Sequence, residues 1–154
     1  PAQFETGLDQ ARYFERLVEA VRSVPGVEAA AVDASAPLAG VTLRFPYSVV
    51  GAPAESNAGN EAVHNPVTEE FFDTIGLRLV VGRLFTAGDD ERGQPVVVVN
   101  EALARRLAPG GHALGVRLRL VPWLSQSEHE VVGIVRDVRQ ENLGDAPPPQ
   151  YYVP

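Results

Sequence analysis

The chain has 154 residues, 45% of them hydrophobic, and a formal net charge of −7, which disfavours binding to nucleic acid or to anionic lipid. It contains no cysteine and its 13 basic residues are all arginine, so thiol chemistry, disulfides and Schiff-base or phosphate-loop lysines are excluded. No apolar run approaches the ~18 residues of a membrane span and no signal segment follows Pro1; because methionine is also absent, we expect a segment of a longer protein.

Residues 8–24 predict an amphipathic helix. Four apolar residues recur at helical spacing and indicate one buried stripe: Phe14, Leu17, Val18 and Val21. The charged residues on the opposite face are expected to be solvated. Pro25-Gly26 ends the helix, and the small residues 27–33 that follow predict a strand.

Residues 43–49 alternate between apolar and polar side chains, which predicts a half-buried strand. Pro46 lies in the middle of this strand and has no N–H to donate, so we expect an edge strand. A polar loop over residues 51–59 leads to a further strand over residues 61–65.

A short helix is expected to begin at Thr68, a good N-cap residue, with Glu69 and Glu70 in its first turn. Three apolar residues are expected to form its buried stripe: Phe71, Phe72 and Ile75. Gly76 fits the left-handed position that ends many helices.

A short strand over residues 77–81 is expected to end at a turn formed by Gly82-Arg83. The unbroken apolar run over residues 96–99 predicts a strand that is buried on both faces. Asn100 is expected to cap the helix that follows. Three residues of this helix are expected to pack inward: Ala102, Leu103 and Leu107.

A hairpin over residues 116–120 and 130–138 and a last strand over residues 151–153 complete the chain. Helices and strands follow one another without regular alternation. This order favours an α+β fold, with a mixed β-sheet, a long N-terminal helix and two short helices.

No constellation in the sequence is suited to chemistry. The three histidines, His64, His112 and His129, are far apart in the chain, and none has a partner at the spacing of a zinc site. The acidic run at residues 89–91 lacks the alternation of a calcium loop, and the glycines of residues 110–115 follow a helix instead of opening one. We therefore predict no catalytic residue, no cofactor and no metal ion.

Two residues are candidates for contact with a partner protein. Trp123 and Leu124 lie in the loop of the predicted hairpin, where apolar side chains either contact another protein or fold back onto the sheet. Arg83 has a different expected role, since it is placed to pair with Asp89 or Asp90 and to brace its turn.

Short motifs along nearly the whole chain occur in a recognisable order. They are Pro25-Gly26-Val27-Glu28, Pro37-Leu38, Val67-Thr68, Phe71-Phe72, Ile75-Gly76-Leu77, Gly82-Arg83 with Phe85 and Asp89, Val98-Val99-Asn100-Glu101-Ala102 with Ala104-Arg105, Leu114-Gly115, Val132-Gly133-Ile134-Val135, Asp137-Val138 and Tyr152-Val153-Pro154. Each motif alone is weak. Their order and spacing together resemble the extracytoplasmic (periplasmic) core domain of MacB-like ABC-transporter permeases, most closely the variant of duplicated permeases of acidobacterial type.

The resemblance implies an α+β domain with a porter-like part and a smaller inserted α/β part over about residues 68–128. It implies a place on the outer, periplasmic side of the bacterial cytoplasmic membrane, between the first and second transmembrane helices of the permease. In the family more of the domain follows the final Tyr-x-Pro segment, so the porter-like part is expected to be incomplete at Pro154.

The resemblance also implies a function. Such domains are not enzymes; they transmit ATP-driven motion of the membrane helices to efflux or to lipoprotein or substrate handling outside the membrane. The implied partners are the rest of the permease, a separate or fused ATPase, a second permease copy in a dimer and, in some relatives, a periplasmic adaptor protein. The alternative is a stand-alone periplasmic or secreted small-ligand-binding domain, whereas a hydrolase that uses carboxylic acids has almost no support.

Overall fold

The computed structural model describes residues 7–33, 43–89, 93–121, 127–138 and 146–154. Within these residues there are four helices: α1 (Gly7–Arg22), α2 (Ala54–Asn57), α3 (Phe71–Thr74) and α4 (Glu101–Leu107). The strands are β1 (Arg44–Val49), β2 (Glu61–Pro66), β3 (Leu79–Gly82), β4 (Val96–Asn100), β5 (Arg117–Leu120), β6 (Glu128–Val135) and β7 (Gln150–Val153). None of the described helices is long and apolar enough to span a membrane.

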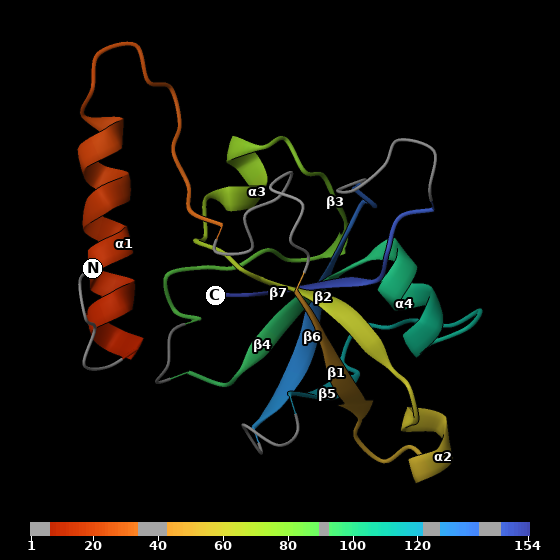
Figure 1. The fold of residues 1–154 in the computed structure, drawn as a ribbon. Helices are drawn as coiled ribbons and strands as arrows, with labels where there is room; N and C mark the ends of the chain where they lie inside the picture. Colours follow the sequence, from red (N-terminus) through yellow and green to blue (C-terminus); the bar gives the residue numbers. More distant parts are fainter. Residues whose placement is uncertain (1–6, 34–42, 90–92, 122–126, 139–145) are drawn as a thin grey trace.

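Six of the strands close into a ring in the order β1-β2-β7-β4-β6-β5, because β5 pairs with β6 on one side and with β1 on the other (Figure 1). The β2–β7 and β4–β6 pairs are parallel, and the other pairs of the ring are antiparallel. One edge of β6 pairs with two strands: its first residues pair with β5 and its last residues pair with β3. The expected α+β fold with a mixed sheet is confirmed.

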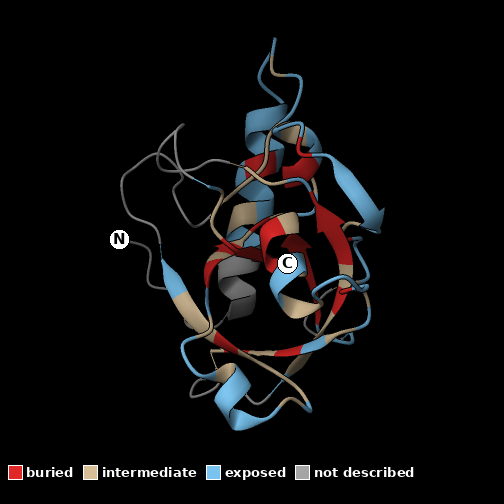
Figure 2. Cartoon of the chain, turned by 90° about the vertical axis from the view of Figure 1, so that its right-hand side faces the viewer, coloured by how far each residue is buried: buried red, intermediate tan, exposed pale blue. Residues whose placement is uncertain are grey.

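Apolar side chains from all six strands fill the inside of the ring. They are Tyr47, Ala62, Val97, Val99, Leu118, Leu120, Val131, Ile134 and Tyr151, joined by Leu103 of α4 and by Ala113. A second apolar cluster covers the outer face of β4 and β7, where α3 packs. Figure 2 shows the buried residues gathered on the central strands.

The strand β4 contributes to both clusters. Val97 and Val99 face the inside of the ring, whereas Val96 and Val98 face the outer cluster. The prediction that this strand is buried on both faces is confirmed. Burying each such side chain stabilises the fold by about 1.5–3 kcal/mol relative to leaving it exposed.

The start of α3 differs from the expected one. The helix begins at Phe71, and the Thr68 hydroxyl accepts a hydrogen bond from the Val32 N–H at 3.3 Å instead of capping the helix. The Phe71 N–H donates to the backbone carbonyl of Thr68 at 3.0 Å, so the backbone closes the preceding turn. The prediction that Thr68 caps this helix with its side chain is therefore wrong.

The end of α3 explains a second difference. Phe71 and Phe72 are buried as expected, but Ile75 is 51% exposed. Gly76 adopts the predicted left-handed conformation and reverses the chain, and the Leu77 N–H donates to the Phe72 carbonyl at 2.7 Å. Leu77 is thereby buried, whereas the helical spacing predicted that Ile75 would be.

The strand β1 is paired on both sides, so the prediction of an edge strand is wrong. Its first half pairs with β2 and its second half with β5. Pro46 lies where the pairing changes, and its carbonyl accepts from the Val121 N–H, one residue beyond β5. The N–H and C=O of a strand residue point to the same side, so the N–H that Pro46 lacks would also have pointed towards β5. Because the β1–β5 pairing ends there, no hydrogen bond within it is lost.

Residues 27–33 form no strand, which is the other clear error of the sequence prediction. Among the described residues this segment makes a single bridge, between Asp33 and Val67. The ring is complete without it. The ring takes β4 and β5 from within residues 68–128 and its other strands from before and after that range, and an inserted subdomain over about residues 68–128 stays a prediction.

The long helix α1 stands beside the ring (Figure 1). Among its residues whose side chains are described, Val18 alone is buried. At the end of the helix the Arg22 guanidinium pairs with the Glu70 carboxylate at 3.1 Å. Leu17 and Val21 of the expected buried stripe are exposed. The helix is thus confirmed, whereas the single buried stripe is not.

Candidate functional site

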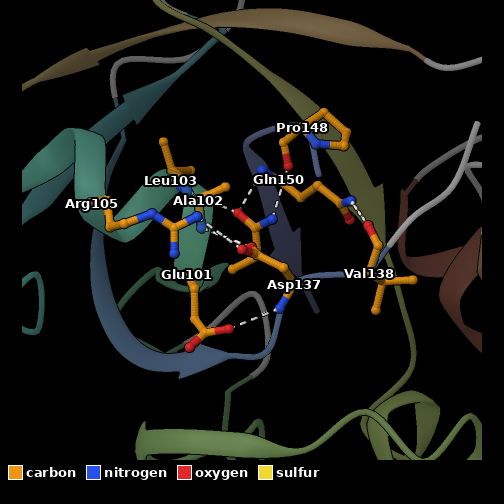
Figure 3. A network of polar contacts seen from close by, with 9 residues as sticks. Glu101, Ala102, Leu103, Arg105, Asp137, Val138, Pro148 and Gln150 are labelled. Carbon is orange, nitrogen blue, oxygen red and sulfur yellow. Dashed lines mark hydrogen bonds and ion pairs between the residues drawn. The ribbon is translucent and has the colours of Figure 1, made fainter. Parts of the chain in front are cut away.

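The buried residue Asn100 joins the ends of β4, α4 and β7 in a network of polar contacts (Figure 3). Its Oδ1 accepts from the Leu103 N–H at 2.9 Å, which caps α4 as predicted, and from the Gln150 N–H at 2.9 Å. Its Nδ2 donates to the Pro148 carbonyl at 2.8 Å. One side chain therefore satisfies a helix end and fixes the segment that leads into β7.

Asp137, which lies two residues after β6, binds the start of α4 from the other side (Figure 3). Its Oδ1 accepts from the Ala102 N–H at 2.8 Å and its Oδ2 from the Arg105 guanidinium at 2.9 Å. The Asp137 N–H in turn donates to the Glu101 carboxylate at 3.2 Å. The protein's own acceptors thus occupy the N-terminus of α4, which leaves it unsuited to anion binding.

Gln150 completes the network in a fully buried position. Its Nε2 donates to the Val138 carbonyl at 3.1 Å, and its Oε1 accepts from the Tyr152 hydroxyl at 2.8 Å. Burial raises the pKa of Tyr152, so the hydroxyl keeps its proton and remains a donor. These contacts satisfy buried polar groups and hold three strands and a helix together, which is a structural task.

A second polar cluster, formed by Arg83, Leu84, Thr86 and Asp89, confirms the predicted pairing of Arg83 with Asp89. The two guanidinium nitrogens Nη1 and Nη2 bind Oδ2 and Oδ1 at 2.6 and 2.9 Å. The carboxylate also accepts from the N–H and the hydroxyl of Thr86 at 2.8 and 2.9 Å, and Arg83 donates to the Leu84 carbonyl. The hydrogen bond from Arg83 is the main cause that lowers the pKa of Asp89 to about 2.

Two glycines allow β3 and β6 to approach closely beside this cluster. A Cβ atom on Gly133 would collide with the Arg83 carbonyl oxygen, and one on Gly82 would collide with the Val132 carbonyl oxygen. Gly82 also has a left-handed backbone with φ of +86°. The Gly82-Arg83 and Val132-Gly133 motifs of the sequence are therefore the two sides of one contact.

The structure places two of the three histidines, both half-buried, on strands that face one another across the ring. His64 follows the inward-facing Ala62 by two residues and His129 precedes the inward-facing Val131 by two, so strand alternation turns both imidazoles inward. Burial lowers the pKa of both, and a charge on His129 lowers that of His64 further. Among the described residues no three metal-ligating side chains converge.

The remaining sequence candidates do not form a site in the described residues. Trp123 and Leu124 lie outside them, as does most of the acidic run at residues 89–91, so a partner contact at Trp123 and Leu124 stays a prediction. Glu70 pairs with Arg22, as described above.

Sequence reasoning missed two relationships between distant parts of the chain. One is the hydrogen bond that joins Asn100 to Gln150, and the other is the placement of His64 and His129 on facing strands of the ring. A usable signal existed for His129, because it alternates with Glu128 and Glu130 in its strand, whereas the strand of His64 shows no alternation. For Gln150 the sequence offers no such signal.

The family described as MacB-like periplasmic core domain matches residues 2–154 of this chain. The chain belongs to the MacB-like periplasmic core domain family. It is the extracytoplasmic domain of a MacB-like ABC transporter permease and lies outside the cytoplasmic membrane, which confirms the resemblance found in the sequence.

Individual relatives agree with this assignment. The ABC transporter permease YvrN of Bacillus subtilis, itself uncharacterized, is 32% identical over 93 residues, which are 57% of this chain and 21% of that protein. This chain therefore spans about a fifth of the length of that permease.

Solved structures share the fold of this MacB-like domain. The periplasmic region of MacB from Actinobacillus actinomycetemcomitans has a TM-score of 0.59 and 18% identity, over 89% of this chain and 52% of that one. A domain of a putative permease from Porphyromonas gingivalis has a TM-score of 0.62 and 22% identity, over 90% and 55%. The extracellular domain of the noncanonical ABC-type transporter YknZ from Gram-positive bacteria has a TM-score of 0.63 and 17% identity, over 92% and 62%.

Proposed function

We propose that this MacB-like domain transmits ATP-driven motion of the permease's membrane helices to efflux, or to lipoprotein or substrate handling, outside the membrane, without catalysing a reaction. The observation that carries the proposal is the arrangement of α1 and the ring. A long helix with an exposed apolar stripe stands beside a closed ring of strands (Figure 1). The contacts between α1 and the ring would carry a displacement of the helix to the ring.

The exposed apolar stripe runs from Tyr13 through the second half of α1 and continues to Val24, two residues beyond the helix end. Its residues recur every three or four positions and are 40% to 53% exposed: Tyr13, Leu17, Val21 and Val24. An apolar stripe on a helix normally packs against another element. Because the solved relatives are longer than this chain, we infer that the stripe packs against a further part of the permease.

The described contacts between α1 with the segment that follows it and the rest of the domain gather around the start of α3. They include the ion pair of Arg22 with Glu70, two hydrogen bonds between Val32 and Thr68 and the bridge between Asp33 and Val67. The ring itself is closed by backbone hydrogen bonds on every side and is expected to move as one body. A shift of α1 would therefore reach the ring as a whole through Thr68 and Glu70, which precede α3.

A transmitting role without catalysis agrees with the structural hydrogen bonds that the polar side chains of the two polar clusters make. The carboxylates of Asp89 and Asp137 and the amides of Asn100 and Gln150 are all engaged in holding loops and strands. The alternative, a small-ligand-binding domain, requires a hollow with converging polar groups, whereas packed side chains fill the inside of the ring, and apart from His64, His129 and the tyrosine hydroxyls these are apolar. The partners that we propose are the rest of the permease, its ATPase, a second permease copy and a periplasmic adaptor.

The absence of cysteine from the chain allows a direct test in the parent permease. A single Leu17→Cys substitution is compared with Glu15→Cys, which lies on the same helix but outside the stripe. With other cysteines of the parent replaced by serine, labelling by a water-soluble maleimide is followed in the nucleotide-free and ATP-trapped transporter. We expect Leu17→Cys to be protected relative to the isolated domain and its labelling rate to change with nucleotide state, while Glu15→Cys labels alike throughout.

The opposite result is equally clear. If Leu17→Cys labels in the assembled transporter at the rate of the isolated domain, whatever nucleotide is bound, the stripe has no partner and α1 does not transmit motion.

A further inference from the structure

The inside of the ring holds three polar atoms that have no hydrogen-bond partner among the described residues. They are Nδ1 of His64, Nδ1 of His129 and the hydroxyl of Tyr151, and all three are buried. The His64 ring packs against the rings of Phe45 and Tyr151, at centroid distances of 5.4 and 5.2 Å. The half-buried His64 imidazole therefore sits among aromatic rings.

The two histidines come from opposite sides of the ring. In the strand order β1-β2-β7-β4-β6-β5, three steps separate β2 from β6 in either direction, so their inward side chains face one another across the interior. His129 lies directly opposite Leu118 in the β5–β6 pairing, which is the seam that closes the ring. A charge on His129 acts to lower the pKa of His64, as the placement of the two imidazoles on facing strands leads one to expect.

Among the described residues no carboxylate lies at an inward position of the ring, where it could pair with a protonated imidazole, although backbone hydrogen bonds with Ser127 and Leu118 act to raise the pKa of His129. Besides His64 and His129, the inward positions of the described ring strands carry apolar or aromatic residues, with Tyr47 on β1 and Tyr151 on β7 as the titratable ones. Burial raises the pKa of both tyrosines, so these phenols stay neutral. The charge of Arg106 on α4, which acts on Tyr47, is positive.

The carboxylates next to His129 in the sequence point to the other side of the sheet. Glu128 and Glu130 flank His129, so strand alternation places them on the outer face. There Glu128 binds the guanidinium groups of Arg117 and Arg119 at 3.0 and 2.7 Å. Glu130 accepts from the Gln94 amide at 3.2 Å. Neither is available to a proton on His129.

We propose that His64 and His129 form an acid-sensitive lock inside the ring, which is closed while both imidazoles are neutral and which a proton on either one loosens at the β5–β6 seam. A buried imidazolium without a carboxylate partner is costly, and a second proton would add repulsion between like charges. For a domain outside the cytoplasmic membrane, the lock would couple the stiffness of the ring to the pH of its surroundings.

The direction of the effect follows from the linkage between protonation and folding. Burial lowers the pKa of both histidines, so below about pH 6.5 the unfolded chain binds protons more readily than the folded ring does. The two neutral histidines therefore make their full contribution to the stability of the fold above that pH, and this contribution is lost as the pH falls through their lowered pKa values.

Proton NMR of the 154-residue chain tests the inference without any substitution, because only three histidines contribute Cε1 signals. We expect the His64 and His129 signals to titrate with midpoints below the ~6.5 of an ordinary histidine. Hydrogen exchange at the β5–β6 seam is expected to accelerate over the same pH range. An ordinary or raised midpoint for both histidines, or a seam whose exchange does not respond, would overturn the inference.

A matched set of variants supplies a second readout. The combination of His64→Phe and His129→Leu replaces both imidazoles by apolar groups, and His112→Gln removes the exposed third histidine as the control. Between about pH 8 and pH 5 we expect the melting temperature of the wild type and of His112→Gln to fall by several degrees, and that of the double variant to fall much less. An equal fall in all three proteins contradicts the lock, and the wild-type titration decides the matter if the double variant does not fold.

Discussion

Arg83 and Asp89 meet fork to fork, with each terminal guanidinium nitrogen on one carboxylate oxygen at 2.6 and 2.9 Å. The Asp89 side chain is only 8% exposed, whereas that of Arg83 is 47% exposed. Solvent therefore screens the arginine, and the value of the pair depends largely on the four hydrogen bonds that reach the carboxylate.

Asp89→Asn should lower the free energy of unfolding by about 1 kcal/mol at neutral pH, since it removes the ion pair but keeps the side-chain shape. The folded pKa of about 2 lies below the ordinary value of 3.8, so the contribution of Asp89 is complete above that value and disappears as the pH falls towards 2. Urea unfolding at a series of pH values measures both effects. Asp73→Asn, at an exposed aspartate of α3, is the control, and equal losses in the two variants would contradict a specific role of the pair.

Gly133→Ala should be strongly destabilising, by about 2 kcal/mol or more, because the new Cβ collides with the Arg83 backbone carbonyl between β3 and β6. The matched variant is Gly111→Ala, whose Cβ would lie at an ordinary 3.7 Å from the Ala108 Cβ. Thermal and urea unfolding compare the two. A Gly133→Ala protein as stable as Gly111→Ala would show that the two strands can move apart without cost.

Asn100→Ala should cost about 2–4 kcal/mol, because it removes the cap of α4 and leaves the buried Gln150 N–H and Pro148 carbonyl without their partner. Asn60→Ala is the control, since the Asn60 amide makes only exposed or half-buried contacts in a loop. Urea unfolding gives the two free energies. A loss below about 1 kcal/mol for Asn100→Ala would mean that water replaces these contacts.

The isolated domain should be unevenly stable, with α1 opening far more readily than the ring. Val18 is the one buried residue of α1 among those whose side chains are described, whereas every residue of β4 is buried, and β4 pairs with β6 along its length and with β7 at Val98 and Val99. Hydrogen exchange should therefore show much lower protection in α1 than in β4. Leu17→Gln should change the unfolding free energy by no more than about 0.5 kcal/mol, and Val97→Ala should lower it by about 1–3 kcal/mol. Equal protection of α1 and β4 would contradict this division.

Local chemistry decided most of what the sequence could predict. The run of four valines before Asn100 identified a strand buried on both faces and the helix cap after it, because both depend on neighbouring residues. The pairing of Arg83 with Asp89 was predictable for the same reason, since six positions and one turn separate them. The family could also be recognised, because its motifs mark turns, caps and strand contacts in a fixed order.

Closure of the ring could not be predicted, because it depends on pairs between distant strands. Pro46 indicates an edge strand by local rules, yet β1 divides its length between two partners and places the proline where they change. The segment 27–33 has the composition of a strand, but the ring closes without it. The proximity of His64 and His129 follows only once β2 and β6 are known to face one another.

The strand β6 pairs with β3, β4 and β5, and this pairing closes the ring and limits how the domain can associate with neighbouring molecules. In a closed ring no strand is left at an end, so a neighbouring molecule cannot extend the sheet of this domain by adding a strand to the six described members. Among the described strands the remaining open edge belongs to β3, which is only four residues long and ends at a glycine. The same closure that confines the imidazoles thus protects the folded domain from intermolecular strand addition and aggregation.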